Sequence, residues 1–212
     1  MYTPKANEET RIPVLHQFIR DNPLSALVTQ TARGMIATHL PMVLEDDGTA
    51  YGVLKGHVAR ANSQWRESMP TADALAIFSG PEHYVSASWY PGKKTHGKEV
   101  PTWNYVAVHA YGRLRVIEDA AWLLEHLKEL TDRNEVIAEM PWKVSDAPPD
   151  FIAKLTGAIV GIELPITELQ GKWKTSPNRS EEDAAAVMDG LSRLGTASAA
   201  KMKEIMQARR LR

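Results

Sequence analysis

Short segments in which apolar and polar residues alternate follow one another along the first half of the chain, and they predict β-strands. The expected strands cover residues 24–30, 35–44, 49–55, 75–79, 84–88 and 102–117. Turn sequences separate them, among them Ala32-Arg33-Gly34 and Asp46-Asp47-Gly48, and Asp-Gly between two such segments is typical of a β-hairpin. Because the first three segments lie so close together, we expect an antiparallel meander, and hence a small barrel or sandwich.

Apolar residues spaced three and four apart predict helices around these strands. The expected helices cover residues 8–21, 120–134, a short segment around 151–155, and two C-terminal segments divided at Gly195. Asp119 is placed to cap the second of these helices, and residues 159–169 read as a strand that returns to the barrel. The sequence therefore predicts a mainly β, antiparallel α+β protein, with one domain over residues 1–180 and a helical extension over residues 181–212.

Charge and composition narrow the possible functions. The chain of 212 residues carries 25 Lys and Arg against 26 Asp and Glu, so its net charge of -1 gives no overall attraction to nucleic acid, and DNA contact would need a local basic surface. It contains no cysteine, which excludes disulfides and thiol chemistry. The polar start and the lack of a long apolar run lead us to expect a soluble cytoplasmic protein without a membrane partner.

Polar aromatic residues gather between Gly80 and Gly112, where four of the six tyrosines, two of the six tryptophans and three of the seven histidines lie. Tyr and Trp join a flat apolar surface to a hydrogen-bonding edge, which suits a planar and partly polar ligand such as a flavin. In the strand that begins near residue 102, Trp103 and Tyr105 share one face and Asn104 lies on the other. These aromatics could stack on a ring, cover a dimer interface, or belong to a plain aromatic core strand.

Three other segments offer groups for an anionic ligand. Lys55, His57 and Arg60 lie within six positions near a strand end, as a phosphate-binding edge would require, although a charged strand end explains them equally. His39 stands beside Pro41, whose missing N–H favours an edge or bulged position. The last segment carries Lys172 and Lys174 around Trp173, which suits a phosphate or a nucleic acid backbone, or simply a solvated loop.

Several catalytic signatures are absent from the sequence. The segment Gly92–Glu99 matches part of a P-loop, but Glu99 stands where Ser or Thr must hold magnesium, and the following residues read as the start of a strand. We therefore expect a flexible basic loop there. We find no G-x-S-x-G, H-E-x-x-H or G-x-G-x-x-G sequence, and the histidines lack metal-ligand spacing, so no metal is expected.

Six motifs in order make the chain resemble the PaiB family, the FMN-binding negative transcriptional regulators. They are MYTPK at the start, ATHLP at 37–41, KGHVARAN at 55–62, GPEHYVSASWY at 80–90, VPTWNY at 100–105 and GKWKTSPN at 171–178. The resemblance implies an FMN-binding split β-barrel, similar to the pyridoxamine-phosphate-oxidase fold. It also implies a homodimer with two sites at the subunit interface.

The resemblance also indicates which residues hold the cofactor. It implies His57, Arg60 and Asn62 for the phosphate and ribityl chain, and His39 with the backbone near Pro41 for the ring. Trp103, Asn104 and Tyr105 are implied to reach the site from the other subunit, and Lys172, Trp173 and Lys174 match the last motif. Ala87 stands where the family has proline, and Thr175 and Pro177 replace Leu and Gln of GKWKLSQN, so Pro177 removes a backbone donor.

Three functions follow as hypotheses. The first is a dimer that binds FMN and represses genes, with its C-terminal basic helices or the GKWK segment as a DNA surface. The second is an FMN-dependent oxidoreductase that passes hydride or electrons from a nicotinamide to a small substrate. The third is a sensor that binds a flavin or a haem-related cofactor without contacting DNA.

Overall fold

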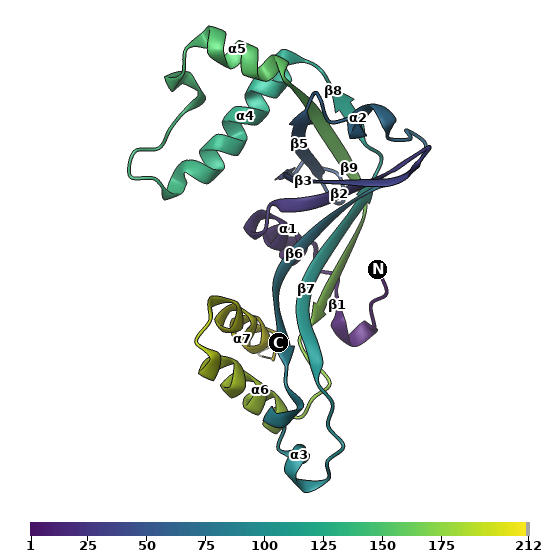
Figure 1. Ribbon diagram of the computed structural model, residues 1–212, viewed down its shortest axis with the longest axis vertical. Coiled ribbons are helices and arrows are strands. Elements are labelled where there is room, and N and C mark those ends of the chain that lie inside the picture. Colours follow the sequence, from purple (N-terminus) through teal and green to yellow (C-terminus); the bar gives the residue numbers. More distant parts are fainter. Residues whose placement is uncertain (211–212) are drawn as a thin grey trace. The chain divides into compact units, whose positions relative to one another are not determined.

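A mainly antiparallel sheet with flanking helices forms the described part of the computed structural model, residues 1–210 (Figure 1). The strands are β1 (Glu8–Glu9), β2 (Leu24–Thr31), β3 (Gly34–Pro41), β4 (Val43–Glu45), β5 (Val53–Ala59), β6 (Ala74–Val85), β7 (Thr102–Gly112), β8 (Arg115–Ile117) and β9 (Ile159–Lys174). Their order is β3-β2-β6-β7-β9-β5-β4, with β1 and β8 also paired to β9. Because β3 and β4 end this order, the described sheet stays open, as in a split barrel.

The helices lie between and after these strands. They are α1 (Ile12–Asp21), α2 (Gln64–Glu67), α3 (Gly92–Thr95), α4 (Ala120–Asn134), α5 (Pro149–Gly157), α6 (Glu181–Leu194) and α7 (Ala197–Arg210). Short 3-10 turns η1 (Lys5–Asn7), η2 (Ala87–Trp89), η3 (Glu135–Ile137) and η4 (Val144–Asp146) complete the chain. None of the helices within residues 1–210 is both long and apolar enough to cross a bilayer.

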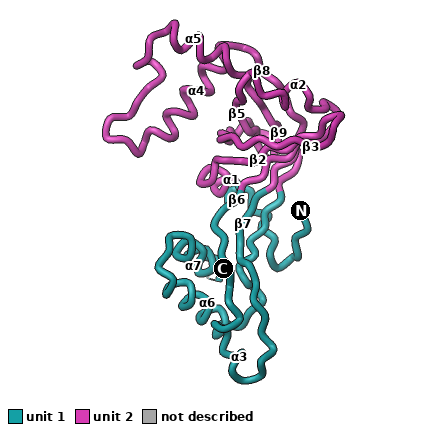
Figure 2. The backbone as a smooth tube through the Cα atoms, viewed as in Figure 1, with its two compact units in different colours: residues 1–15, 79–108, 170–212 teal, residues 16–78, 109–169 magenta. Residues whose placement is uncertain are grey.

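The chain divides into two compact units (Figure 2). Unit 1 contains residues 1–15, 79–108 and 170–212, and unit 2 contains residues 16–78 and 109–169. The two C-terminal helices thus belong to a unit that also holds parts of three strands. The domain division at residue 180 remains a proposal.

Unit 2 is built on two hairpins whose inward side chains form its core. Strands β2 and β3 pair from Leu24↔Pro41 to Thr31↔Gly34, and Gly34 takes the positive φ of 119° that this turn requires. Strands β4 and β5 pair from Val43↔Lys55 to Glu45↔Val53. Fully or nearly fully buried side chains come from both hairpins and from β9: Leu27, Leu40, Leu44, Leu54, Ile162 and Leu164. Each contributes about 1.5–3 kcal/mol by leaving water.

Unit 1 has a separate apolar core in which α6 and α7 pack on the chain that follows β6. The core consists of Val85, Tyr90, Val187, Leu191, Ala199, Met202 and Met206, with Trp89 and Met188 packed against it. The Ser180 side chain accepts the Asp183 N–H at the start of α6, and Gly195 ends α6 with a φ of 66°. The break at Gly195 and the cap at Asp119, whose carboxylate accepts the Trp122 N–H, are confirmed.

Some element boundaries differ from the expectation. Strand β5 begins at Val53 instead of residue 49, because the Asp46 and Asp47 carboxylates accept the backbone N–H groups of Gly48 and Thr49 and lengthen the turn. The strand expected at 75–79 continues to Val85 as the single strand β6, and the strand expected at 84–88 is wrong beyond Val85, because the 3-10 turn η2 begins at Ala87. The segments 35–44 and 102–117 are each divided into two strands, and the expected loop at Gly92 begins with the short helix α3. The GKWK segment is the end of β9, and not a loop.

Candidate functional site

The ATHLP and KGHVARAN motifs lie side by side in unit 2. The Asn62 side-chain amide donates to the Thr38 hydroxyl at 2.9 Å, which joins the two motifs directly. A Cβ placed at Gly56 would lie 3.3 Å from the Pro41 carbonyl oxygen, so glycine lets strand β5 approach the end of β3 closely. Asn62 also accepts the Gln64 backbone N–H, so its side chain stabilises the start of α2.

The edge position expected for Pro41 is confirmed, because β3 lies at one end of the strand order. His39 and Pro41 are both exposed on this edge strand, on the same face as Met35, which is 80% exposed. The neighbouring positions Thr38 and Leu40 turn to the other face, where Leu40 is buried. His39 therefore lies where a ligand or a partner surface can contact it.

The three basic groups of the KGHVARAN motif all have partners within unit 2. Lys55 forms an ion pair with Glu45 across the β4–β5 hairpin. The Arg60 guanidinium donates to Glu118 at 2.6 Å and to the carbonyl oxygens of Gly157 and Ile159 at 2.9 and 3.1 Å. Arg60 thus fixes the end of α5 and the start of β9, and three of its five N–H donors are already used.

His57 pairs with a second histidine, His126 of α4. His57 Nδ1 and His126 Nε2 lie 3.2 Å apart, so one of the two nitrogens must carry a hydrogen and donate it to the other. His126 is only 3% exposed, and its Nδ1 atom has no hydrogen-bond partner. Burial lowers the pKa of His126 to about 4, with the charges of His57 and Lys55 acting in the same direction, and burial also lowers the pKa of His57.

An indole ring holds this histidine pair in place. Trp122 stacks on His126 with ring centroids 5.3 Å apart and 20° between the planes, and its Nε1–H donates to Glu163 at 3.1 Å. Gly161, the partner of His57 across the β5–β9 ladder, makes room for this indole, because a Cβ there would collide with the ring. The arrangement favours two neutral imidazoles at neutral pH.

Lysines and tyrosines form a cationic and aromatic group in unit 1. The Lys172 and Lys174 ammonium groups lie 5.2 and 5.9 Å from the centroid of the Tyr105 ring. Lys172, only 9% exposed, donates to the Tyr2 carbonyl oxygen, and Lys174 donates to the Thr102 hydroxyl, each at 3.0 Å. Two ammonium groups beside one ring suit a ligand that is both anionic and planar.

The alternation expected in β7 is confirmed. Asn104 is completely buried, Tyr105 is half-buried and Trp103 is 51% exposed, with its indole N–H directed to Glu82. Asn104 has the partners that its burial requires, since its Oδ1 accepts the Ser176 hydroxyl at 2.9 Å and its amide contacts the Met206 sulfur at 3.6 Å. It therefore has a structural explanation, as does the buried Trp173.

The altered KTSPN segment lines a cavity of about 440 Å³ in unit 1. The lining includes Lys174, Ser176 and Pro177 together with Thr102 and Arg179. Ser176 has a φ of 58°, an uncommon value for a residue other than glycine, immediately before Pro177. This cavity is a recess of mixed polar and apolar lining that includes Lys174.

Sequence reasoning missed several residues of these groups. In unit 2 they are His126, Trp122 and Glu163, and in unit 1 they are Tyr2, Thr102 and Ser176. A signal existed for two of them, because Trp122 and His126 are four residues apart and flank Leu123 on the apolar face of the expected helix. Nothing in the local sequence of Tyr2 indicates its contact with Lys172.

The donor set of the two groups fits a flavin mononucleotide. A phosphate monoester takes ammonium and imidazole donors, and a flavin ring takes aromatic surface and amide-like hydrogen bonds. In unit 1, Lys172 and Lys174 provide ammonium groups and Tyr105 provides aromatic surface. In unit 2, the Nδ1 atom of the buried His126 has no hydrogen-bond partner. Each group thus offers chemically suitable side chains.

Comparison with known sequences places this chain among flavin proteins. Residues 1–168 match the family described as "Putative FMN-binding domain". The Bacillus subtilis protein named Protease synthase and sporulation protein PAI 2 is 32% identical, and the match covers 98% of this chain and 97% of that protein. An uncharacterised protein of Emericella nidulans is 34% identical over 99% of this chain and 97% of its own length.

Solved structures with the same fold carry flavins according to their descriptions. The flavocytochrome Anf3 from Azotobacter vinelandii superposes with a TM-score of 0.58, at 19% identity, over 84% of this chain and 74% of that one. The FAD and heme binding protein from Mycobacterium smegmatis also gives a TM-score of 0.58, at 17% identity, over 85% and 80% of the two chains. At such identities the likeness establishes the split-barrel fold alone.

Proposed function

Because this chain belongs to the PaiB family of FMN-binding proteins, we propose that it is an FMN-binding transcriptional regulator that acts as a homodimer. The observation that carries the proposal is the match to PAI 2 over nearly the full length of both chains. The family and the cofactor class rest on sequence, and the fold agrees with them. When bound, FMN supplies reversible uptake of hydride or single electrons.

Our proposal for the cofactor site uses residues from both groups. Lys55 and His57 bind the phosphate and ribityl chain, with Asn62 positioning that motif, and His39 and Pro41 lie near the ring. For Arg60 the proposal changes, because its guanidinium is held by Glu118 and two carbonyl groups, so it acts by fixing the site's surroundings.

The second group is proposed to complete the site in the dimer. Trp103 and Tyr105 offer aromatic surface to the ring, and Lys172 and Lys174 offer charge to the phosphate. Trp173 and Asn104 support these residues from the buried side of their strands. This proposal requires that the site contain residues of two subunits.

The regulatory part of the proposal depends on a DNA surface, for which α7 is the best candidate. Two of its basic residues are already engaged, since Arg209 contacts Glu9 and Arg210 donates to the Arg179 carbonyl oxygen. DNA contact by this helix would therefore depend on Lys203 and on Lys201, which has only an exposed ion pair with Glu204 at 3.1 Å. Because these lysines would contact phosphate groups, such binding should weaken as the salt concentration rises.

The test begins with a titration of the purified protein with FMN, followed by flavin fluorescence and the visible spectrum. We expect saturation at one flavin per chain. His57→Ala should weaken binding by about ten-fold, the loss of one charge-assisted hydrogen bond, while His96→Ala, a change of an exposed histidine outside both groups, should leave it unchanged. No saturable binding, or equal effects of the two variants, would overturn the cofactor assignment.

A second measurement separates regulator from enzyme. The FMN-loaded protein is mixed with promoter DNA from its own operon at several salt concentrations, and separately with reduced nicotinamide. A salt-dependent shift of the DNA, weakened by Lys201→Gln with Lys203→Gln, supports the regulator. Steady nicotinamide consumption without any DNA shift contradicts it and favours an oxidoreductase.

A further inference from the structure

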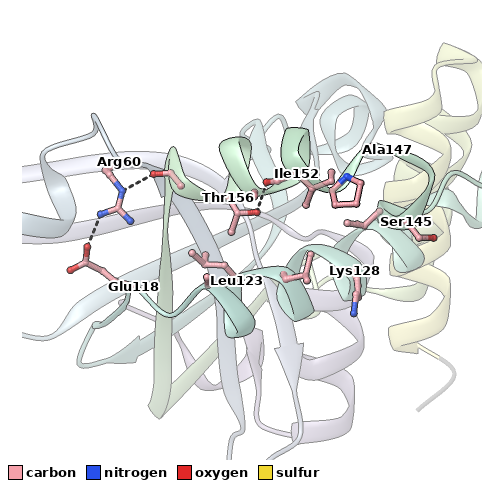
Figure 3. A pocket seen from close by; sticks show the side chains of 14 residues that line it. Arg60, Glu118, Leu123, Lys128, Ser145, Ala147, Ile152 and Thr156 are labelled. Atoms are coloured by element: carbon pink, nitrogen blue, oxygen red, sulfur yellow. Dashed lines mark hydrogen bonds and ion pairs between the residues drawn. The ribbon is translucent and has the colours of Figure 1, made fainter.

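An apolar cavity of about 550 Å³ lies between α4 and α5, within unit 2 (Figure 3). Most of its lining is aliphatic: Ala120, Leu123, Leu124, Val144, Ile152 and Ala153. Figure 3 shows Leu123 and Ile152 on opposite walls, with Arg60 and Glu118 at one end and Lys128 and Ser145 at the other. The volume is that of a small organic molecule, and it is too small for a docked helix.

Hydrogen bonds fix one end of this cavity. Arg60 binds the carbonyl oxygens of Gly157 and Ile159 and so fixes the C-terminal end of α5. The Thr156 hydroxyl donates to the Ile152 carbonyl oxygen within its own helix and offers nothing to a wall opposite. The cavity is therefore preformed, which lowers the cost of binding a ligand.

The charges at the rim select an anion. The lining residues include two cations, Arg60 and Lys128, and one carboxylate, Glu118. Glu118 is neutralised by Arg60 at 2.6 Å. The Lys128 ammonium group forms an ion pair with the Glu125 carboxylate at 3.3 Å, and the two side chains are 47% and 78% exposed. Such an exposed ion pair is weak. Lys128 thus lies at one end of an apolar cavity, and a rotation of its exposed side chain would bring the ammonium group to that end.

We propose that this cavity binds a small amphipathic organic anion, with an apolar or aromatic body between α4 and α5 and an acid group at Lys128. The site is separate from the residues assigned to FMN, apart from Arg60, which forms part of its wall. Because α4 also carries His126, the partner of His57, occupancy of this cavity acts on an element that contacts the cofactor motif.

The test uses two dyes of the same shape, followed by calorimetric titration. 1-Anilinonaphthalene-8-sulfonate carries a sulfonate, and N-phenyl-1-naphthylamine is its uncharged counterpart. We expect one sulfonate dye per chain, bound about three-fold more tightly than the uncharged dye. Lys128→Gln should abolish that difference, whereas Lys154→Gln, which removes the same charge from an exposed residue outside the lining, should preserve it.

Blocking variants decide whether the dyes occupy this cavity. Ala120→Phe and Ala153→Phe fill it from opposite walls at exposed positions, and each should weaken both dyes by about ten-fold. Circular dichroism checks that the variants are folded, and Lys128→Gln, at an exposed position, tests the anion site without altering the core. Unchanged dye binding in both blocking variants, or absence of saturable binding, overturns the proposal, as do equal effects of the two lysine variants.

Discussion

At the scale of single residues, the pair of His57 and His126 should make folding depend on pH. Because the folded state holds the pKa of His126 at about 4, below the ordinary value of 6.5, the unfolded state binds more protons between these two pH values. The free energy of unfolding should therefore fall as the pH falls from 6.5 towards 4, by about 3 kcal/mol at most. Urea unfolding measured at several pH values gives this slope.

The variant His126→Gln removes the titrating group while an amide can still bond His57. We expect it to be less stable than the natural chain at pH 7 and to show a flatter pH dependence between pH 6.5 and 4. His16→Gln is the control, because His16 Nε2 contacts the Tyr51 carbonyl oxygen outside this pair. If His126→Gln and the natural chain have parallel stability profiles, His126 does not titrate as described.

The same pair explains what the sequence could and could not predict about the site. His57 was found because a histidine near basic residues at a strand end is a local pattern. Its partner lies 69 positions further along the chain, and only the pairing of β5 with β9 and the packing of α4 bring the two together. The contacts of Arg60 with Glu118 and with the carbonyl oxygens of Gly157 and Ile159 are equally non-local, and for this reason a residue predicted to bind the ligand has a structural role instead.

At the scale of elements, helix α6 depends on a glycine for its packing. A Cβ at Gly190 would collide with the Trp89 indole, which packs on the core of unit 1. Gly190→Ala should therefore lower the free energy of unfolding by about 1–3 kcal/mol, although alanine is the better helix former. Gly157→Ala is the matched control in α5, where the new Cβ meets no atom within 4 Å, and it should be neutral or stabilising. Equal melting temperatures for the two variants would contradict this account.

The elements that were predicted wrongly from the sequence are those whose extent depends on long-range strand pairing. Gly80 and Pro81 read as a break between two strands, yet β6 continues through them from Ala74 to Val85. The polar GKWK segment reads as a loop, but Glu8 pairs with Lys172 and extends β9 to Lys174. By contrast, the ends of α4 and α6 depend on Asp119, Ser180 and Gly195, whose effects are local, and these were predictable.

At the scale of the whole molecule, one sheet face of unit 2 has the composition of a subunit interface. Leu24 is 60% exposed and Met35 is 80% exposed, and the ladder of β2 and β3 carries Ala26 paired with His39 and Val28 paired with Ala37 between them. A largely apolar face of this kind, interrupted by His39 and Gln30, is typical of an interaction surface. We propose that a second copy of this chain covers it, because the PaiB resemblance implies a homodimer.

Met35→Glu should then dissociate the dimer, because a buried carboxylate without a partner is costly at an apolar interface. Sedimentation or light scattering over a range of protein concentrations measures the change, and the circular dichroism of the variant should stay unchanged because Met35 is exposed.

Ile137→Glu is the matched control, since Ile137 is 91% exposed in the connection between α4 and α5. If only Ile137→Glu dissociates the dimer, the interface lies at that connection and not on the face of β2 and β3. If the natural chain is a monomer, the proposed dimer is wrong. If Met35→Glu dissociates the dimer and also weakens FMN binding, the joint loss supports a site that needs two subunits.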